Sequence, residues 1–159
     1  MVEIRKATSA DSEDMDRIQR DSLQSQAVDE YSSEQLEYMT AVDDDRLLIP
    51  PEKIEADSHV YIIAEQDGLP VGYGGIDIDE GLLAATFVDP SVLQQGVGQA
   101  IAERLQQIAQ DHDIGVLRTY ASLNVTGFYE QIGFQKRECV TVGGGAGPEI
   151  PSVVMEKRV

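Results

Sequence analysis

The 159-residue sequence has no tryptophan and a single cysteine, Cys139. One thiol cannot form a disulfide within the chain, which is typical of a protein in a reducing compartment. No apolar run approaches the length of a membrane span, and the N-terminal stretch MVEIRKATSADSED lacks the apolar core of a signal peptide. These absences predict a cytoplasmic protein without a membrane partner.

Basic residues are also scarce. The chain has 12 lysines and arginines against 29 acidic residues, which gives a formal net charge of −17. Nucleic acids and anionic membranes are bound through basic patches, so this balance argues against both as partners. The four lysines are Lys6, Lys53, Lys136 and Lys157.

The acidic, lysine-poor composition resembles that of cytosolic proteins from extreme halophiles. Molar salt shortens the Debye length to about 3 Å and so screens the self-repulsion of such a surface. We therefore favour a halophilic, archaeal source, and the alternative is an acidic protein of a mesophile.

His59 and His112 are too few and too isolated to suggest a metal site.

Hydrophobic periodicity predicts one α+β domain over residues 1–159, with no internal repeat and no interior linker. The expected strands cover residues 2–7, 59–65, 70–78, 82–88, 116–121, 135–142 and 151–159. The expected helices cover residues 8–23, 31–39, 99–110 and 124–134. The chain is long enough for one domain with a real core.

Local signals mark the ends of several elements. The spacing of a capping box occurs at Thr8 with Asp11 and at Ser32 with Gln35. The pair at 67–68, Asp-Gly, predicts a tight hairpin between two strands. We expect the helix over 8–23 to begin at Thr8 and the helix over 31–39 to begin at Ser32.

Two glycines are placed to end helices. Gly115 is expected to end the helix over 99–110, and Gly133 to be the left-handed cap of the helix over 124–134. Residues 41–58, with an acidic triple and a Pro-Pro pair, are expected to form a long loop. Long loops inside compact domains are often functional.

A Gly-x-Gly segment opens the helix over 99–110. Backbone N–H groups at a helix N-terminus can hold a phosphate, and glycine removes the Cβ that would keep the anion away. The candidate cradle consists of Gln94, Gln95, Gly96, Val97 and Gly98. The alternative is a tight turn that only starts an amphipathic helix.

Two well-known phosphate sites do not fit this segment. A P-loop requires a lysine directly after its last glycine, and none is present. A dinucleotide fingerprint requires a third glycine, but this chain has Ile101 at that position. The fingerprint also places its first glycine directly after the strand, whereas here Pro90 and several further residues intervene. A nucleotide-binding protein is therefore disfavoured.

The wider segment FVDPSVLQQGVGQAIAERL resembles the acetyl-CoA-binding segment of the GCN5-related N-acetyltransferases (GNAT family). Val88, Pro90, Gly96 and Gly98 match the family's pattern. Leu93 departs from it, because arginine or glutamine is usual there.

A second segment, LNVTGFYEQIGF, is similar to a more specific block of the same family. The matching residues are Asn124, Phe128, Tyr129, Gly133 and Phe134. Taken alone, Tyr129 could be a tyrosine at the edge of the core and Asn124 a helix N-cap. The resemblance extends over nearly the whole chain and favours functional roles for both.

The resemblance implies a GNAT fold. We expect a mixed central sheet of about six to seven strands, about four helices and splayed central strands. The whole chain, residues 1–159, would then be one GNAT acetyltransferase domain.

The resemblance also implies an N-acetyltransferase that uses acetyl-CoA and no metal. The acetyl group would pass to a primary amine by direct attack in a ternary complex. Amides of residues 94–98 would hold the pyrophosphate, while the main chain of Phe87 and Val88, together with Asn124, would hold the pantetheine arm. A backbone N–H near Phe87 would polarise the thioester carbonyl, and Tyr129 would protonate the departing thiolate.

The general base is not assigned, since the strand over 82–88 carries alanines where some family members have glutamate. The weak candidates, each also an ordinary surface residue, are His59, Asp77, Asp79 and Glu80. The acceptor is expected to be a small-molecule or peptide amine, and a homodimer fits the fold family. The alternative function is a non-catalytic CoA-binding sensor or partner module.

Overall fold

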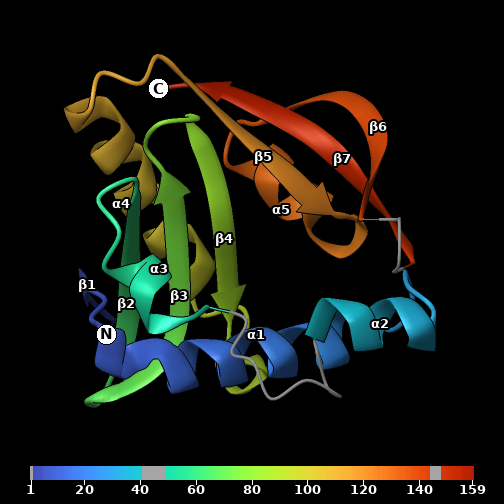
Figure 1. Cartoon of the computed structure of the whole chain (residues 1–159), viewed down its shortest axis with the longest axis horizontal. Helices are drawn as coiled ribbons and strands as arrows, with labels where there is room; N and C mark the ends of the chain where they lie inside the picture. Colours follow the sequence, from blue (N-terminus) through green and yellow to red (C-terminus); the bar gives the residue numbers. More distant parts are fainter. Residues whose placement is uncertain (1, 41–48, 144–147) are drawn as a thin grey trace.

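A seven-stranded sheet in the order β1-β2-β3-β4-β5-β7-β6 forms the centre of the molecule (Figure 1). The computed structural model describes residues 2–40, 49–143 and 148–159. The strands are β1 (Glu3–Lys6), β2 (His59–Gln66), β3 (Leu69–Asp77), β4 (Leu82–Val88), β5 (Val116–Ser122), β6 (Gln135–Gly143) and β7 (Glu149–Arg158). The predicted α+β class is confirmed.

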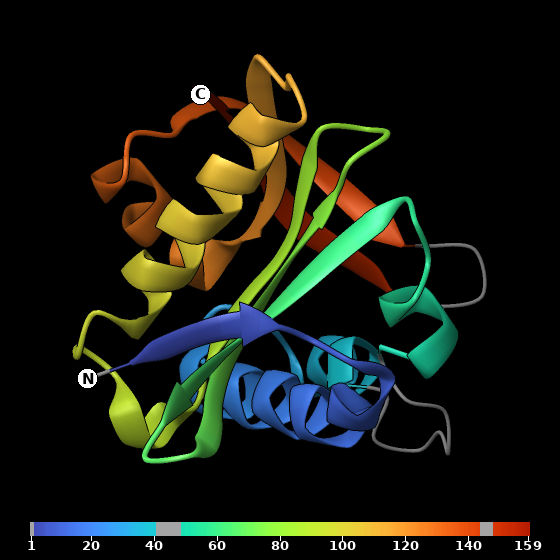
Figure 2. The same cartoon turned by 90° about the vertical axis from the view of Figure 1, so that its left-hand side faces the viewer.

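Five α-helices occur within the described ranges. They are α1 (Ser12–Gln26), α2 (Ser33–Thr40), α3 (Pro51–Ile54), α4 (Val97–Asp111) and α5 (Thr126–Gln131). Short 3-10 turns precede three of them: η1 (Ser9–Asp11), η2 (Pro90–Val92) and η3 (Leu123–Val125). Helix α4 lies on one face of the sheet and α1 on the other, with α5 on the side of α4 (Figure 2). None of the described helices is both long and apolar enough to cross a membrane.

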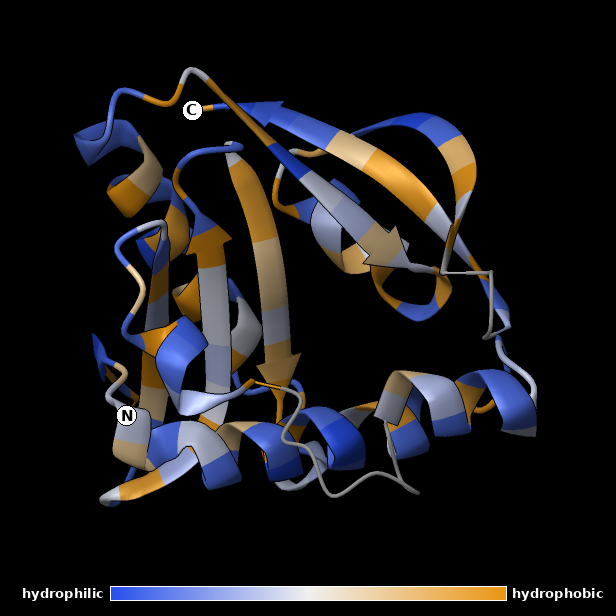
Figure 3. Cartoon of the chain, viewed as in Figure 1, coloured by the Kyte–Doolittle hydropathy of each residue, from blue (hydrophilic) through white to orange (hydrophobic). Residues whose placement is uncertain are grey.

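The core forms where helices pack on the two faces of the sheet. Ile101 and Leu105 of α4 are fully buried against β3 and β4. Glycines of β3 permit this close approach, because a Cβ at Gly74 would overlap the Ile101 side chain. Met15 and Ile18 of α1 fill the core on the other face. Apolar residues accordingly follow the central strands, while α1 is largely hydrophilic on its outer side (Figure 3).

The two central strands, β4 and β5, diverge. They are parallel, and a single register pair, Leu82 with Arg118, joins them. Ala84 has no partner in β3, because the neighbouring pairs are Leu83 with Ile76 and Ala85 with Gly75. This bulge bends β4 at the point of divergence. The predicted splayed strands are thus confirmed.

Several predicted caps and turns are confirmed. The Ser32 N–H donates to Gln35 Oε1 at 2.9 Å, and the Gln35 N–H donates to Ser32 Oγ at 3.1 Å, which is the reciprocal capping box. Asp67 and Gly68 both have positive φ, at 54° and 78°, as a type I′ hairpin turn requires. Gly133 has φ 104° and ends α5.

The capping box at Thr8 starts η1 rather than α1 directly. The Thr8 N–H donates to Asp11 Oδ2 at 2.8 Å, so the expected pairing is present. The α-helix then begins at Ser12, one turn later than predicted.

The expectation that Gly115 ends a helix was wrong. Helix α4 ends at Asp111, and the left-handed residue is Asp113, with φ 59°. The Ile114 N–H donates back to the Ala109 carbonyl at 2.9 Å, which closes a Schellman motif around Asp113. Aspartate tolerates the left-handed region better than most residues, so glycine is not needed here.

The expectation of one long loop over 41–58 was also wrong in part. Helix α3 occupies Pro51–Ile54 within it, and proline suits the first position of a helix. Residues 41–48, which hold the acidic triple, lie outside the described residues.

Candidate active site

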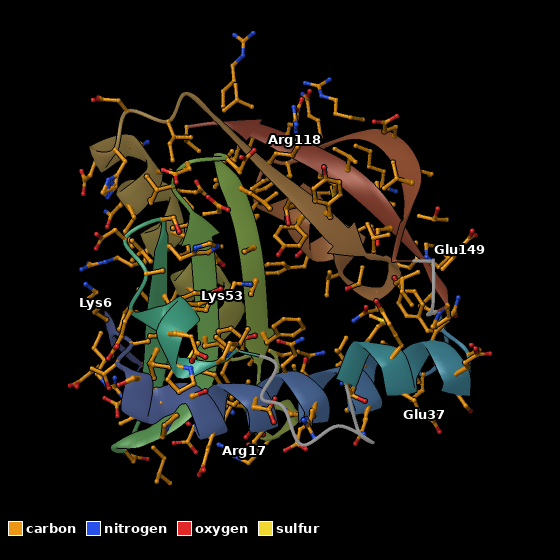
Figure 4. The ribbon with its side chains drawn as sticks, viewed as in Figure 1. Lys6, Arg17, Glu37, Lys53, Arg118 and Glu149 are labelled. Carbon is orange, nitrogen blue, oxygen red and sulfur yellow. The ribbon has the colours of Figure 1, made fainter. Side chains whose placement is uncertain are left out.

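The loop between β4 and α4 is fixed at its start by Asp89. Its Oδ1 accepts a hydrogen bond from the Ser91 N–H at 2.9 Å, and its Oδ2 lies 3.1 Å from Arg17 Nη1. Arg17 lies on α1 (Figure 4). Burial raises the pKa of Asp89, but the hydrogen bonds from Ser91 and Arg17 hold it below its usual value. A charged Asp89 therefore links this loop to α1.

The loop reaches α4 through two residues in the left-handed region. Gln94 has φ 64° and Gly96, the N-cap of α4, has φ 81°. No atom lies within 4 Å of a Cβ placed on Gly96, so backbone conformation rather than space favours glycine there. The first helical bond runs from the Ala100 N–H to the Gly96 carbonyl at 3.0 Å. The N–H groups before Ala100 are left without partners in the helix and can bind an anion.

A cavity of about 880 Å³ extends from this loop between α4 and α5. Six of the predicted site residues line it: Val88, Gln94, Gly96, Val97, Gly98 and Asn124. A Cβ on Gly98 would come within 3.3 Å of the Phe128 ring, so glycine lets α5 lie close to the start of α4. At the start of α4, main-chain atoms rather than a side chain of Gly98 therefore line the cavity.

Asn124 lies in η3 and has a buried Oδ1 without a hydrogen-bond partner. It is not a helix N-cap, since the caps are Ser122 for η3 and Val125 for α5. A buried acceptor without a partner costs free energy unless a ligand or water satisfies it. The positions of the caps at Ser122 and Val125 exclude the alternative interpretation of Asn124 as a helix N-cap.

Tyr129 is buried behind the cavity wall, with 4% of its surface exposed. Its ring packs edge-on against Phe128 and Phe134, with centroids 5.3 Å apart in each case. Burial raises the pKa of the phenol above its usual value, and the polar side chains of Thr86 and Thr119 beside it oppose the rise. Because Thr86 on β4 lines the cavity, the phenol is held next to the space that a ligand would occupy.

Residues 20–158 match the profile of the acetyltransferase (GNAT) domain family. The chain belongs to the GNAT family. No curated protein matches it in sequence.

Solved structures share the fold of this GNAT domain. A GCN5-related N-acetyltransferase from Rhodopseudomonas palustris is 24% identical, with a TM-score of 0.86 over 99% of this chain and 95% of that one. The PaiA N-acetyltransferase from Thermoplasma acidophilum, solved with coenzyme A, is 21% identical, with a TM-score of 0.78 over 100% and 99%. YncA from Salmonella typhimurium, solved with acetyl-CoA, is 17% identical, with a TM-score of 0.68 over 99% and 94%.

Two predicted residues of the GNAT domain turn their side chains elsewhere. Phe87 packs on Tyr73, with ring centroids 5.6 Å apart, on the opposite face of β4 from Thr86 and Val88. Gln95 does not line the cavity, and its Oε1 accepts a hydrogen bond from Gln66 at 3.2 Å. Only their backbones remain candidates for ligand contacts.

The candidate bases do not meet at the cavity. His59 Nε2 lies 3.5 Å from Asp77 Oδ2, and Asp77 Oδ1 accepts from the Glu80 N–H at 3.1 Å. Asp77 is paired with Leu82, at the closed end of the splayed strands. None of the four candidates is among the described residues that line the cavity.

Two charged residues of the cavity were missed by reasoning from sequence. Glu103 lies on the lining face of α4, in a row with Gln99 and Gln106 that helical spacing could have revealed. Lys157 enters from β7, and no local pattern signals its position. No group of acidic, histidine or cysteine side chains among the described residues could hold a metal ion.

Proposed function

We propose that this GNAT domain transfers an acetyl group from acetyl-CoA to a primary amine, by direct attack of the amine in a ternary complex. The observation that carries the proposal is the buried phenol of Tyr129 beside Thr86, a residue in the wall of a cavity that starts at the cradle of residues 94–98. PaiA and YncA, which share the fold, were solved with coenzyme A and acetyl-CoA.

The residues present fit acetyl-CoA. The free N–H groups at the start of α4 suit a pyrophosphate, and the cradle requires no basic side chain for this. The unpartnered Oδ1 of Asn124 would accept a hydrogen bond from an amide N–H of the pantetheine arm. The main chain of Phe87 and Val88 would bind the arm from β4, and a backbone N–H near Phe87 would polarise the thioester carbonyl.

In the transfer, the amine nitrogen forms a bond to the acetyl carbon and the bond from that carbon to sulfur breaks. The thiolate leaves with the electron pair of that bond and takes the proton of the Tyr129 phenol. Since burial raises the pKa of this phenol, it is protonated at neutral pH and available as a general acid. The amine must also lose a proton to a general base, and this role is not assigned to any of the described cavity residues.

The acceptor is proposed to be a small-molecule or peptide amine, and the protein to act in the cytoplasm at high salt, as a monomer or homodimer. The charge of −17 supports the high-salt setting, because salt would screen the repulsion between scattered carboxylates.

Calorimetric titration with acetyl-CoA, followed by thiol release with a panel of primary amines at high KCl, tests the proposal. We expect binding and amine-dependent thiol release. Binding without turnover for any amine would instead support the non-catalytic CoA-binding module, and absence of acetyl-CoA binding would exclude both.

A further inference from the structure

Lys157 places an ammonium group at the end of the cavity away from the cradle. Its Nζ donates to the Ile132 carbonyl at 2.6 Å, at the end of α5, and to Gln106 Oε1 of α4 at 2.9 Å. An ammonium has three N–H donors, and these contacts use two. The group is therefore held in place and retains a donor, while its side chain lines the cavity.

The described lining of the cavity has few charged side chains, so the ammonium of Lys157 is unusual there. Lys157 is the one cation among the described lining residues, and Glu103 is the one anion. Glu103 Oε1 accepts a hydrogen bond from Gln99 Nε2 at 3.1 Å, so a neutral amide covers part of that carboxylate. Five lining side chains are glutamines: Gln26, Gln94, Gln99, Gln106 and Gln131.

The cavity follows α4 from the cradle to Lys157. Gly98 and Gln106 are eight residues apart on this helix, which corresponds to about 12 Å at about 1.5 Å per residue. Gln99 and Glu103 line the wall between them. The cradle and Lys157 therefore lie along the same cavity, and a ligand whose diphosphate lies on the cradle can extend along α4 towards Lys157.

We propose that Lys157 binds the 3′-phosphate on the ribose of CoA and so lets the protein distinguish CoA from dephospho-CoA. This rests on the proposed function, because it places the CoA diphosphate on the cradle. Lysine binds phosphate as a point charge, and an ammonium already oriented by two acceptors loses little freedom when it does so. In a chain of net charge −17, this ammonium supplies the attraction that a dianionic phosphate needs.

The test compares two ligands across three proteins. Calorimetry at one fixed KCl concentration gives the Kd of CoA and of dephospho-CoA for the wild type, Lys157→Met and Arg158→Met. Arg158 is the matched control, because it is the next residue on β7, is exposed and carries the same charge. Loss of the Lys157 contact with Ile132 would weaken both ligands alike, so the ratio of the two Kd values isolates the phosphate contact.

We expect the wild type and Arg158→Met to prefer CoA by at least about tenfold, since hydrogen bonds to charged groups have about this effect. In Lys157→Met the preference should fall to less than about threefold. An equal preference in Lys157→Met and the wild type would overturn the assignment, as would a wild type that binds both ligands equally. Failure of the wild type to bind either ligand would overturn the proposed function as well.

Discussion

The phenol of Tyr129 on α5 lies beside the Thr86 side chain on β4, and Thr86 lines the cavity. The phenol thus lies where β4 and β5 diverge, and its surroundings keep it protonated. A buried tyrosine hydroxyl usually finds a polar neighbour, and here that neighbour faces a ligand cavity. The relationship favours a chemical role for Tyr129.

Tyr129→Phe is predicted to lower kcat by about 10²–10⁴-fold, the range for loss of a general acid, while the Kd of acetyl-CoA changes by less than about threefold. The measurements are thiol release and calorimetry. Tyr120→Phe is the matched control, because this tyrosine is 48% exposed on β5 and loses the same hydroxyl. Equal kcat in Tyr129→Phe and the control would remove Tyr129 from the mechanism.

The pH dependence of kcat follows from the raised pKa of Tyr129. A general acid works in its protonated form, so activity is retained below the pKa and lost above it. Because burial raises this pKa above the ordinary tyrosine value of about 10, we expect any fall in kcat at saturating substrates to be centred above about pH 10. A fall centred well below pH 10 that disappears in Tyr129→Phe would show that the phenol is not shielded as the structure indicates.

Asn124→Leu is predicted to separate stability from binding. Removing a buried acceptor that has no partner leaves the free energy of unfolding unchanged or raises it by about 1 kcal/mol. The same change should weaken acetyl-CoA binding by about 5–30-fold, the equivalent of about 1–2 kcal/mol. Chemical denaturation and calorimetry give the two quantities, and a destabilised variant with unchanged affinity would mean that Asn124 serves the fold alone.

Salt is predicted to strengthen both folding and cosubstrate binding. The chain and CoA are both anionic, and the Debye length falls from about 10 Å at 0.1 M salt to about 3 Å at 1 M. The melting temperature and the affinity for acetyl-CoA should therefore rise together over this range of KCl. If the melting temperature and the affinity both stay constant or fall, the halophilic interpretation of the composition is wrong.

The fold was predictable because its signals are local. The alternation of strands, the Asp67-Gly68 turn and the cap at Ser32 each depend on neighbours within a few residues, and all are present. The end of α4 was not predicted correctly, because Asp113 adopts a left-handed conformation that glycine adopts more often. Backbone closure of the Schellman motif decided this end.

The site was predictable only in part, because its contacts are long-range. Because side chains alternate between the faces of a strand, the sequence of β4 indicates that Thr86 and Val88 share one face and that Phe87 lies on the other. The prediction for Phe87 concerned only its main chain. Nothing near Lys157 in the sequence indicates that it meets α4 and α5. Asn124 and Tyr129 were ambiguous by residue type, and their burial and partners are what distinguish the possible roles.

The most direct test of the account is calorimetric titration of acetyl-CoA into the wild type, Gly96→Ala and Gly68→Ala. Both glycines have positive φ and open space around a Cβ, so each substitution adds backbone strain of about 1 kcal/mol, but only Gly96 belongs to the cradle. We predict 1:1 binding to the wild type and to Gly68→Ala, and at least about tenfold weaker binding to Gly96→Ala. Equal affinity in all three proteins, or no binding to the wild type, would contradict the assignment of residues 94–98 as the cradle for acetyl-CoA.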